Sequence, residues 1–279
     1  MNIVFNCKYF EFHKDYCDNI ENELKARGHA SIISTDEAEY PDADFTIQPD
    51  EACIRQGGKG IWINHAFPFV PHNKFYLGEE FKNTLKLNSD YIFTFSEEWK
   101  NNHSIYEIET FVVGMPKLDL LFNRNPVMST ILYAPTWNKD LTSLGSVDQQ
   151  KLKKYGEVIF RGHPAFYNNK VSYKDAIKKA SIVISDYSSV GLEAIVLNIP
   201  TILFESPKWK SVRTNHISNK AMEAAICVSN QKELEQAVQT YILNPEHLQA
   251  ERLKYSKLLC EHQGQSSKIF VDTLERLYV

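Results

Sequence analysis

The alternation of short apolar strands with helix-forming segments along the whole chain most constrains its fold. A strand, a helix and a second strand in succession favour a parallel pair with a right-handed crossover, so the alternation predicts open parallel sheets covered by helices. We expect strands at 3–6, 30–34, 45–47, 60–64, 91–95, 110–113, 130–134, 157–160, 181–184, 200–204 and 225–228. We expect helices at 14–27, 148–155, 173–180, 189–197, 231–243 and 245–260, with others between the strands of the first half.

A polar stretch, Asn123-Arg-Asn-Pro126, separates two α/β halves, which we interpret as domains 1–125 and 126–279. Residues 1–128 hold 12 Lys or Arg and 20 Asp or Glu, a net charge of −8, whereas the remainder holds 19 and 15, a net charge of +4. An anionic ligand is therefore expected on the second domain, although an uneven surface charge without a function gives the same counts.

The segment from Ser185 to Gly191 carries the strongest functional signal. It is predicted to be a buried strand that turns through paired hydroxyls, Ser188 and Ser189, into a helix. The free amides of a helix's first turn and its positive dipole end bind phosphate, and the two hydroxyls can add donors. An ordinary helix cap has the same residue types, so this segment alone leaves both interpretations open.

Two other strands stop at polar residues, in Ile131-Leu-Tyr-Ala-Pro-Thr-Trp137 and in Val158-Ile-Phe-Arg-Gly-His-Pro164. In an open parallel sheet the carboxyl ends of the strands line the ligand site. We therefore expect Thr136, Arg161, His163 and Ser188 to converge at one edge of the sheet.

The chain resembles the CDP-glycerol glycerophosphotransferases of teichoic-acid and capsule synthesis. The resemblance covers roughly residues 60 to 270 and rests on motifs that follow the family's order. They are Trp62-Ile-Asn-His65-Ala66, Gly114-Met-Pro-Lys-Leu-Asp119, Tyr133-Ala-Pro-Thr-Trp137, Arg161-Gly-His-Pro164, Ser185-Asp-Tyr-Ser-Ser189 and Gly264-Gln-Ser-Ser267. The family has the GT-B glycosyltransferase fold, so the resemblance implies two Rossmann-like domains with a cleft between them.

The sequence departs from the family's pattern at four positions. Trp62 stands three residues before His65 rather than one, and Ala66 replaces the family's Gly. Lys117 replaces an Arg, which keeps the charge but loses the bidentate fork, and Glu193 replaces an Asp.

The resemblance implies a role for each candidate site residue. His65 would be the base that accepts the proton of the attacking hydroxyl, and His163 would hold the donor phosphates and stabilise the leaving group. The donor would be bound by Thr136, Arg161, Ser188, Ser189 and Glu193. Alternatively, Arg161 lies behind the residues that contact the donor, and Glu193 is a carboxylate in the first turn that the helix dipole stabilises. Asp186 would orient the turn, and Lys117 is an additional candidate.

We expect a transferase that moves a glycerol phosphate, or a related polyol or sugar unit, from a CDP-activated donor to an acceptor hydroxyl in cell-surface polymer synthesis. The acceptor would be a saccharide, a polyol phosphate or a lipid-linked chain, and we expect no metal and no other cofactor. Two alternatives stay open: a GT-B glycosyltransferase that uses a nucleotide sugar, and a nucleotide-binding module without catalysis. The acidic first half argues against a nucleic-acid acceptor.

The odd number of cysteines, five, and their unpaired spacing argue against a disulfide framework or a zinc site. Because no apolar run reaches the length of a membrane span, we expect a cytoplasmic protein with at most peripheral contact to the inner membrane face.

Overall fold

The computed structural model describes residues 1–7, 10–36, 38–49, 55–63, 67, 79–164, 166–206, 208–209 and 216–279, without the side chains of 10–15. The described residues form two compact units. The first comprises the described residues of Met1–Ala66, His72–Phe122 and Cys260–Val279, and the second those of Phe67–Pro71 and Asn123–Leu259.

The first unit is built on a parallel sheet with the strand order β2-β1-β3-β4-β5-β6 in the described part of the chain. Its strands are β1 (Asn2–Asn6), β2 (Ala30–Ser34), β3 (Phe45–Gln48), β4 (Lys59–Ile63), β5 (Tyr91–Thr94) and β6 (Glu109–Val112). Its helices are α1 (Phe10–Ala26), α3 (Glu79–Asn88), α4 (Glu97–His103) and α12 (Ser266–Tyr278), with short 3-10 helices η1 (Ser104–Tyr106) and η2 (Pro116–Leu121). Helix α1 turns Tyr16, Ile20 and Leu24, spaced four residues apart, into the core.

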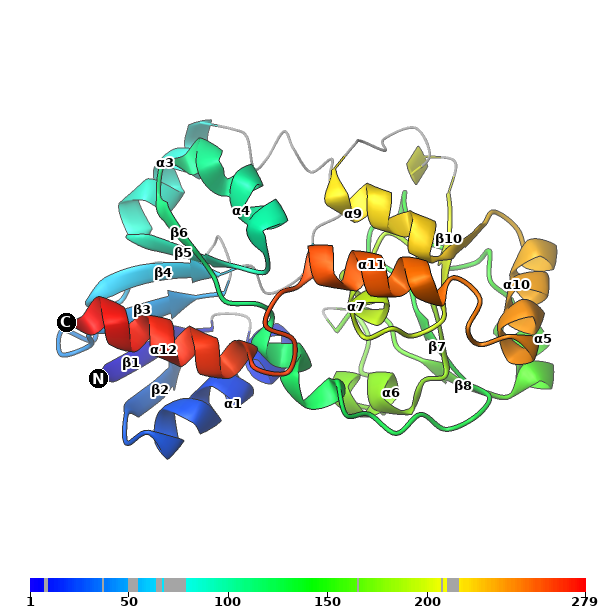
Figure 1. The fold of residues 1–279 in the computed structure, drawn as a ribbon, viewed down its shortest axis with the longest axis horizontal. Helices are drawn as coiled ribbons and strands as arrows, with labels where there is room; N and C mark the ends of the chain where they lie inside the picture. The colour runs from blue at the N-terminus through cyan, green and yellow to red at the C-terminus, as the bar shows by residue number, and fades with distance from the viewer. Residues whose placement is uncertain are drawn as a thin grey trace. The chain divides into compact units, whose positions relative to one another are not determined.

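Helix α12 brings the end of the chain back to the first unit, where it packs against α1 (Figure 1). Its buried side chains include Phe270, whose ring centroid lies 4.8 Å from that of Phe93 on β5. The predicted second domain, 126–279, is therefore corrected at its C-terminal end. The apolar face of α12 is buried in the first unit, and residues 260–279 belong there.

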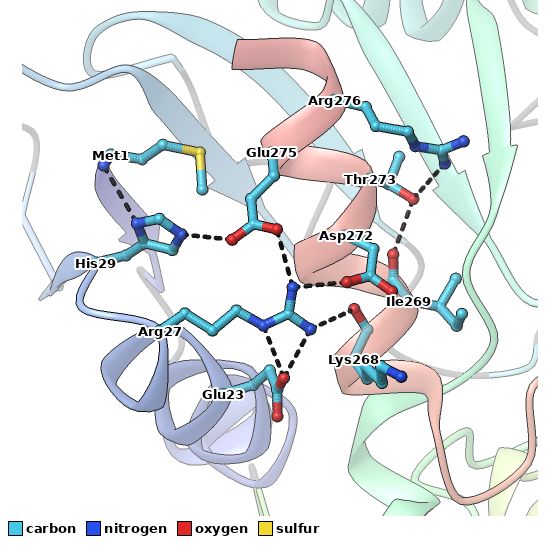
Figure 2. A network of polar contacts seen from close by, with 10 residues as sticks. All are labelled: Met1, Glu23, Arg27, His29, Lys268, Ile269, Asp272, Thr273, Glu275 and Arg276. Atoms are coloured by element: carbon cyan, nitrogen blue, oxygen red, sulfur yellow. Dashed lines mark hydrogen bonds and ion pairs between the residues drawn. The ribbon is translucent and has the colours of Figure 1, made fainter. Parts of the chain in front are cut away.

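A polar network joins the end of α1 to α12 (Figure 2). Arg27 contacts Glu23 at 2.8 Å, and on α12 it contacts Asp272 at 2.6 Å and Glu275 at 2.9 Å. His29 contacts the other oxygen of Glu275 at 2.8 Å. One guanidinium with several carboxylate partners fixes the position of the last helix more precisely than an isolated surface pair can.

The second unit is built on a parallel sheet with the strand order β11-β10-β9-β7-β8 in its described residues. Its strands are β7 (Thr130–Ala134), β8 (Glu157–Phe160), β9 (Ile182–Ser185), β10 (Thr201–Phe204) and β11 (Ile226–Val228). Its helices are α5 (Gln149–Leu152), α6 (Tyr173–Lys179), α7 (Ser189–Val196), α9 (Ile217–Lys220), α10 (Gln231–Leu243) and α11 (Gln249–Leu259), with 3-10 helices η3 (Lys153–Tyr155) and η4 (Ala221–Ala224).

The predicted strands are confirmed, each to within one residue at either end. The predicted helices are also found, with 148–155 divided into α5 and η3 and 245–260 shortened to α11. Helix α12 was not predicted as a helix. Four cysteines, Cys7, Cys17, Cys227 and Cys260, are free thiols, and Cys53 lies outside the described residues.

Candidate functional site

The turn after β9 presents the start of helix α7 at the carboxyl edge of the second sheet. Ser188 precedes the helix in an extended conformation, with φ −130° and ψ 143°, and its side chain makes no capping bond to the helix. Gly191 lets α7 approach the sheet, because a Cβ there would lie 2.7 Å from Leu203 Cδ2. Ser188 and Ser189 are both half-buried residues at the start of the helix, where backbone amides can bind an anion, and their predicted contact with a phosphate stays a prediction.

Asp186 fixes this turn to the loop that follows β7. Its carboxylate is fully buried and accepts hydrogen bonds from the Thr136 amide at 2.7 Å, from the Ser143 amide at 2.7 Å and from the Ser143 hydroxyl at 2.7 Å. Burial raises the pKa of Asp186 to about 6 in spite of these bonds. The predicted orienting role of Asp186 therefore has a geometric basis, and Ser143, which the sequence did not indicate, supplies two of its three donors.

The loop after β8 carries the next two candidates. The Arg161 amide donates to the Tyr133 carbonyl at 2.9 Å, which keeps the start of the loop beside β7. The Arg161 guanidinium lies 5.4 Å from the centre of the Tyr173 ring. The His163 ring lies 6.2 Å from the rings of Trp137 and Phe166.

Glu193 lies one turn into α7 and is fully buried. Its carboxylate accepts a hydrogen bond from the hydroxyl of Tyr173, whose ring Arg161 also contacts. In this structure Glu193 therefore takes part in a buried contact between α7 and α6, and its predicted contact with a donor hydroxyl stays a prediction.

The strand order explains why these residues meet. Strands β8, β7 and β9 are neighbours and run parallel, so their carboxyl ends lie at one edge. The structure thus brings Thr136, Arg161, His163 and Ser188 to the same edge of one sheet, the edge at which open α/β sheets bind ligands.

Hydrogen bonds connect two of the family motifs in the first unit, residues 114–119 and residues 264–267. Asp119 on η2 accepts hydrogen bonds from the amides of Ser266 at 2.9 Å and Ser267 at 2.6 Å, and so caps α12. The Ser266 hydroxyl accepts a bond from the Met115 amide at 3.0 Å. At Gly114, where φ is +79°, a Cβ would lie 2.4 Å from the same hydroxyl oxygen, so only glycine fits.

The remaining candidates in the first unit are Lys117, Trp62, His65 and Ala66. Lys117 lies on η2 with a half-buried side chain. Trp62 is buried in the core on β4, where its ring meets those of Phe81 and His103 edge-on. His65 and Ala66 lie outside the described residues, so the predicted base stays a prediction.

Residues 82–276 match the family model of the CDP-glycerol:poly(glycerophosphate) glycerophosphotransferases. The chain belongs to this family. Membership places it among the transferases, as predicted, and the matched residues include every motif of the site in the second unit. None of the curated proteins compared with the chain matches its sequence.

Solved structures of other proteins share the fold of this chain. The wall teichoic acid polymerase TagF is 15% identical, with a TM-score of 0.72 over 99% of this chain and 88% of that one. A TagF variant soaked with CDPG is similar to the chain with a TM-score of 0.70 and the same identity, over 99% of this chain and 88% of that one. The UDP-GlcNAc 2-epimerase from Neisseria meningitidis, bound to UDP-GlcNAc, is 13% identical, with a TM-score of 0.55 over 99% of this chain and 100% of that one. These likenesses confirm the predicted GT-B architecture of two Rossmann-like α/β domains.

Within the described part of the chain, none of the helices combines the length and the apolar character that crossing a membrane requires.

Proposed function

We propose that the protein transfers glycerol phosphate from CDP-glycerol to an acceptor hydroxyl in the synthesis of a cell-surface polymer. Its family membership supports the reaction class. The observation that carries the proposal is the convergence of the Ser188 turn, Thr136 and the Arg161–His163 loop at one sheet edge, because these groups form a site for a diphosphate.

The proposed reaction is a direct displacement at phosphorus. The acceptor oxygen forms a bond to the β-phosphorus of the donor while the bond from that phosphorus to the bridging oxygen breaks. Cytidine monophosphate leaves with the electron pair, and the acceptor's proton goes to His65. Ser188, Ser189, the first-turn amides of α7 and His163 stabilise the negative charge that develops on the leaving phosphate.

Donor screening tests this proposal directly. Thermal shift with CDP, UDP, GDP and CMP should give the largest stabilisation with the cytidine nucleotides, and incubation with CDP-glycerol and an acceptor should release CMP. Release of UDP from a nucleotide sugar instead would favour the glycosyltransferase alternative. Nucleotide binding without turnover of any donor would favour the binding module. The expected cytoplasmic location and peripheral membrane contact stay predictions.

Replacing Ser188 and Ser189 together by Ala should weaken CDP binding by about 1–3 kcal/mol in total, the size of hydrogen bonds to a charged group. Since the Ser188 side chain does not cap α7, the free energy of unfolding should change little. Asn230 offers a matched control, because it caps α10 beyond β11 with a bond from the Glu233 amide at 3.0 Å. Asn230→Ala should lower stability by about 1 kcal/mol and leave CDP affinity unchanged. Equal CDP affinity of the double variant and the wild type in calorimetry would refute the donor-phosphate assignment.

Transfer should continue in the presence of EDTA, within about twofold of the untreated rate, because helix amides and His163 supply the phosphate contacts. The carboxylates beside the turn are occupied: both oxygens of Asp186 accept protein hydrogen bonds, and Glu193 accepts one from Tyr173. A loss of activity that added magnesium restores would contradict this proposal.

A further inference from the structure

Two large aromatic side chains at the edge of the candidate site are open to solvent. Trp137 is 54% exposed and Phe166 is 65% exposed, whereas Tyr133, Trp209 and Tyr241 of the same unit are buried. The rings of Trp137 and Phe166 lie nearly parallel, at 22°, with their centroids 6.0 Å apart. With the His163 ring, 6.2 Å from each, they form one aromatic cluster (Trp137, His163 and Phe166).

Hydrogen bonds of the backbone fix the cluster in place. The amides of Phe166 and Tyr167 donate to the His163 carbonyl at 2.9 and 3.1 Å, which closes a turn that returns Phe166 to the histidine. The Asn169 side chain donates to the carbonyls of Gly162 at 3.0 Å and Tyr167 at 3.2 Å. Gly162 is required here, because a Cβ would lie 2.3 Å from the Tyr167 ring.

Trp137 is held in place by the loop after β7. It directly follows Thr136, whose amide is bound by the buried carboxylate of Asp186. The cluster therefore joins the loops after β7 and β8, and both loops are anchored at the same sheet edge as the Ser188 turn. Exposed aromatic faces held by such bonds bury too little surface to serve the core, and they offer a flat apolar platform for a ligand.

We propose that the aromatic cluster stacks the nucleobase of the donor, a subsite that rests on the proposed function. The cluster is continuous with the residues that would hold the diphosphate, and a nucleobase is the planar aromatic part of such a donor. Trp137 and Phe166 already contact each other, so the base packs on the exposed ring faces rather than between them. Stacking of this kind strengthens the binding of any nucleobase, and its contribution depends little on the phosphates.

The test compares Trp137→Ala and Phe166→Ala with the wild type, using CDP, CMP and inorganic pyrophosphate as probes. CDP and CMP affinity should fall about 5- to 150-fold in Trp137→Ala, and inhibition of CMP release by pyrophosphate should stay unchanged. Trp137→Phe should recover most of the affinity, because it keeps a ring. Tyr278→Ala is the matched control: Tyr278 is 55% exposed on α12 of the first unit, and its loss should leave all three probes unaffected.

Four results would overturn the subsite. Wild-type CDP affinity in both alanine variants would show that the cluster does not contact the base, while the proposed function would stand. If Trp137→Ala weakened inhibition by pyrophosphate as much as it weakened CDP binding, Trp137 would stabilise the phosphate turn and would not bind the base. Unchanged CDP affinity with a raised KM for the acceptor would assign the cluster to the acceptor. If the wild type bound neither CDP nor CMP, the proposed function itself would fail, and the subsite with it.

Discussion

Asp186→Ala should lower the free energy of unfolding by about 3 kcal/mol at pH 7 and should weaken nucleotide binding as well. The change leaves three buried donors without their acceptor, the two amides of Thr136 and Ser143 and the Ser143 hydroxyl, and each such group costs about 1–3 kcal/mol. Part of this loss is offset, because the buried carboxylate is itself unfavourable when charged. Its pKa is raised from 3.8 to about 6, which corresponds to about 3 kcal/mol.

The difference in stability between wild type and Asp186→Ala should depend on pH with a definite sign. Because the pKa of Asp186 is higher in the folded state than in the unfolded state, a larger fraction of the folded protein carries this proton between pH 3.8 and about 6. The part of the Asp186 contribution that depends on the bound proton is therefore complete below the unfolded pKa and is lost as the pH rises through the folded pKa, while the part that comes from its hydrogen bonds remains at pH 7. Between pH 7 and pH 5 the gap between the two proteins should widen by about 1 kcal/mol.

Guanidinium titrations at the two pH values measure both effects. Asp140 provides a matched control, because its side chain is 63% exposed and its partner is the surface residue Lys208. Asp140→Ala should change stability by no more than about 0.5 kcal/mol at either pH. If Asp186→Ala destabilised the protein no more than Asp140→Ala, the carboxylate would not be what holds the two loops together.

The architecture of both sheets could be predicted because its signals are local. Strands β7 and β8 are apolar runs that end at turn or polar residues, and both were predicted to the residue. Helix α10 was also predicted to the residue, from its apolar spacing between Asn230 and Asn244. Once the strands are known to be parallel, the meeting of Thr136, His163 and Ser188 at one edge follows from the topology.

What the sequence did not predict depends on contacts between distant positions. The bonds from Ser143 to Asp186 join residues 43 positions apart, and no local pattern marks that serine. Position on α7 suggested that Glu193 could reach a ligand, whereas the structure buries it against Tyr173, 20 positions away. The destination of α12 was missed for the same reason: its apolar face is visible in the sequence, but its partners α1, η2 and β5 are not.

The exposure of Trp137 could not be predicted either. A tryptophan after an apolar strand is more often buried, and the motif that contains it gave no sign of the stacked Phe166, 29 positions further on. The turn that returns Phe166 to His163 depends on the amide bonds to the His163 carbonyl and on the close contact of Tyr167 with Gly162.

His65→Ala should reduce transfer by about 10²- to 10⁴-fold, the range for loss of a general base, while CDP affinity and the melting temperature stay near those of the wild type. A base that acts on the acceptor contributes to the chemical step and does not hold the donor, so only the rate should respond.

His163→Ala is the informative counterpart. His163 lies at the sheet edge that would hold the donor phosphates, so its loss should lower both the rate and CDP affinity. Calorimetry with CDP, alongside measurement of CMP release, therefore distinguishes the roles of the two histidines by the effect of each substitution on donor binding. If His65→Ala unfolded the protein or weakened CDP binding as strongly as His163→Ala, His65 would be a structural or donor-binding residue, and the base of the proposed displacement would have to come from another residue.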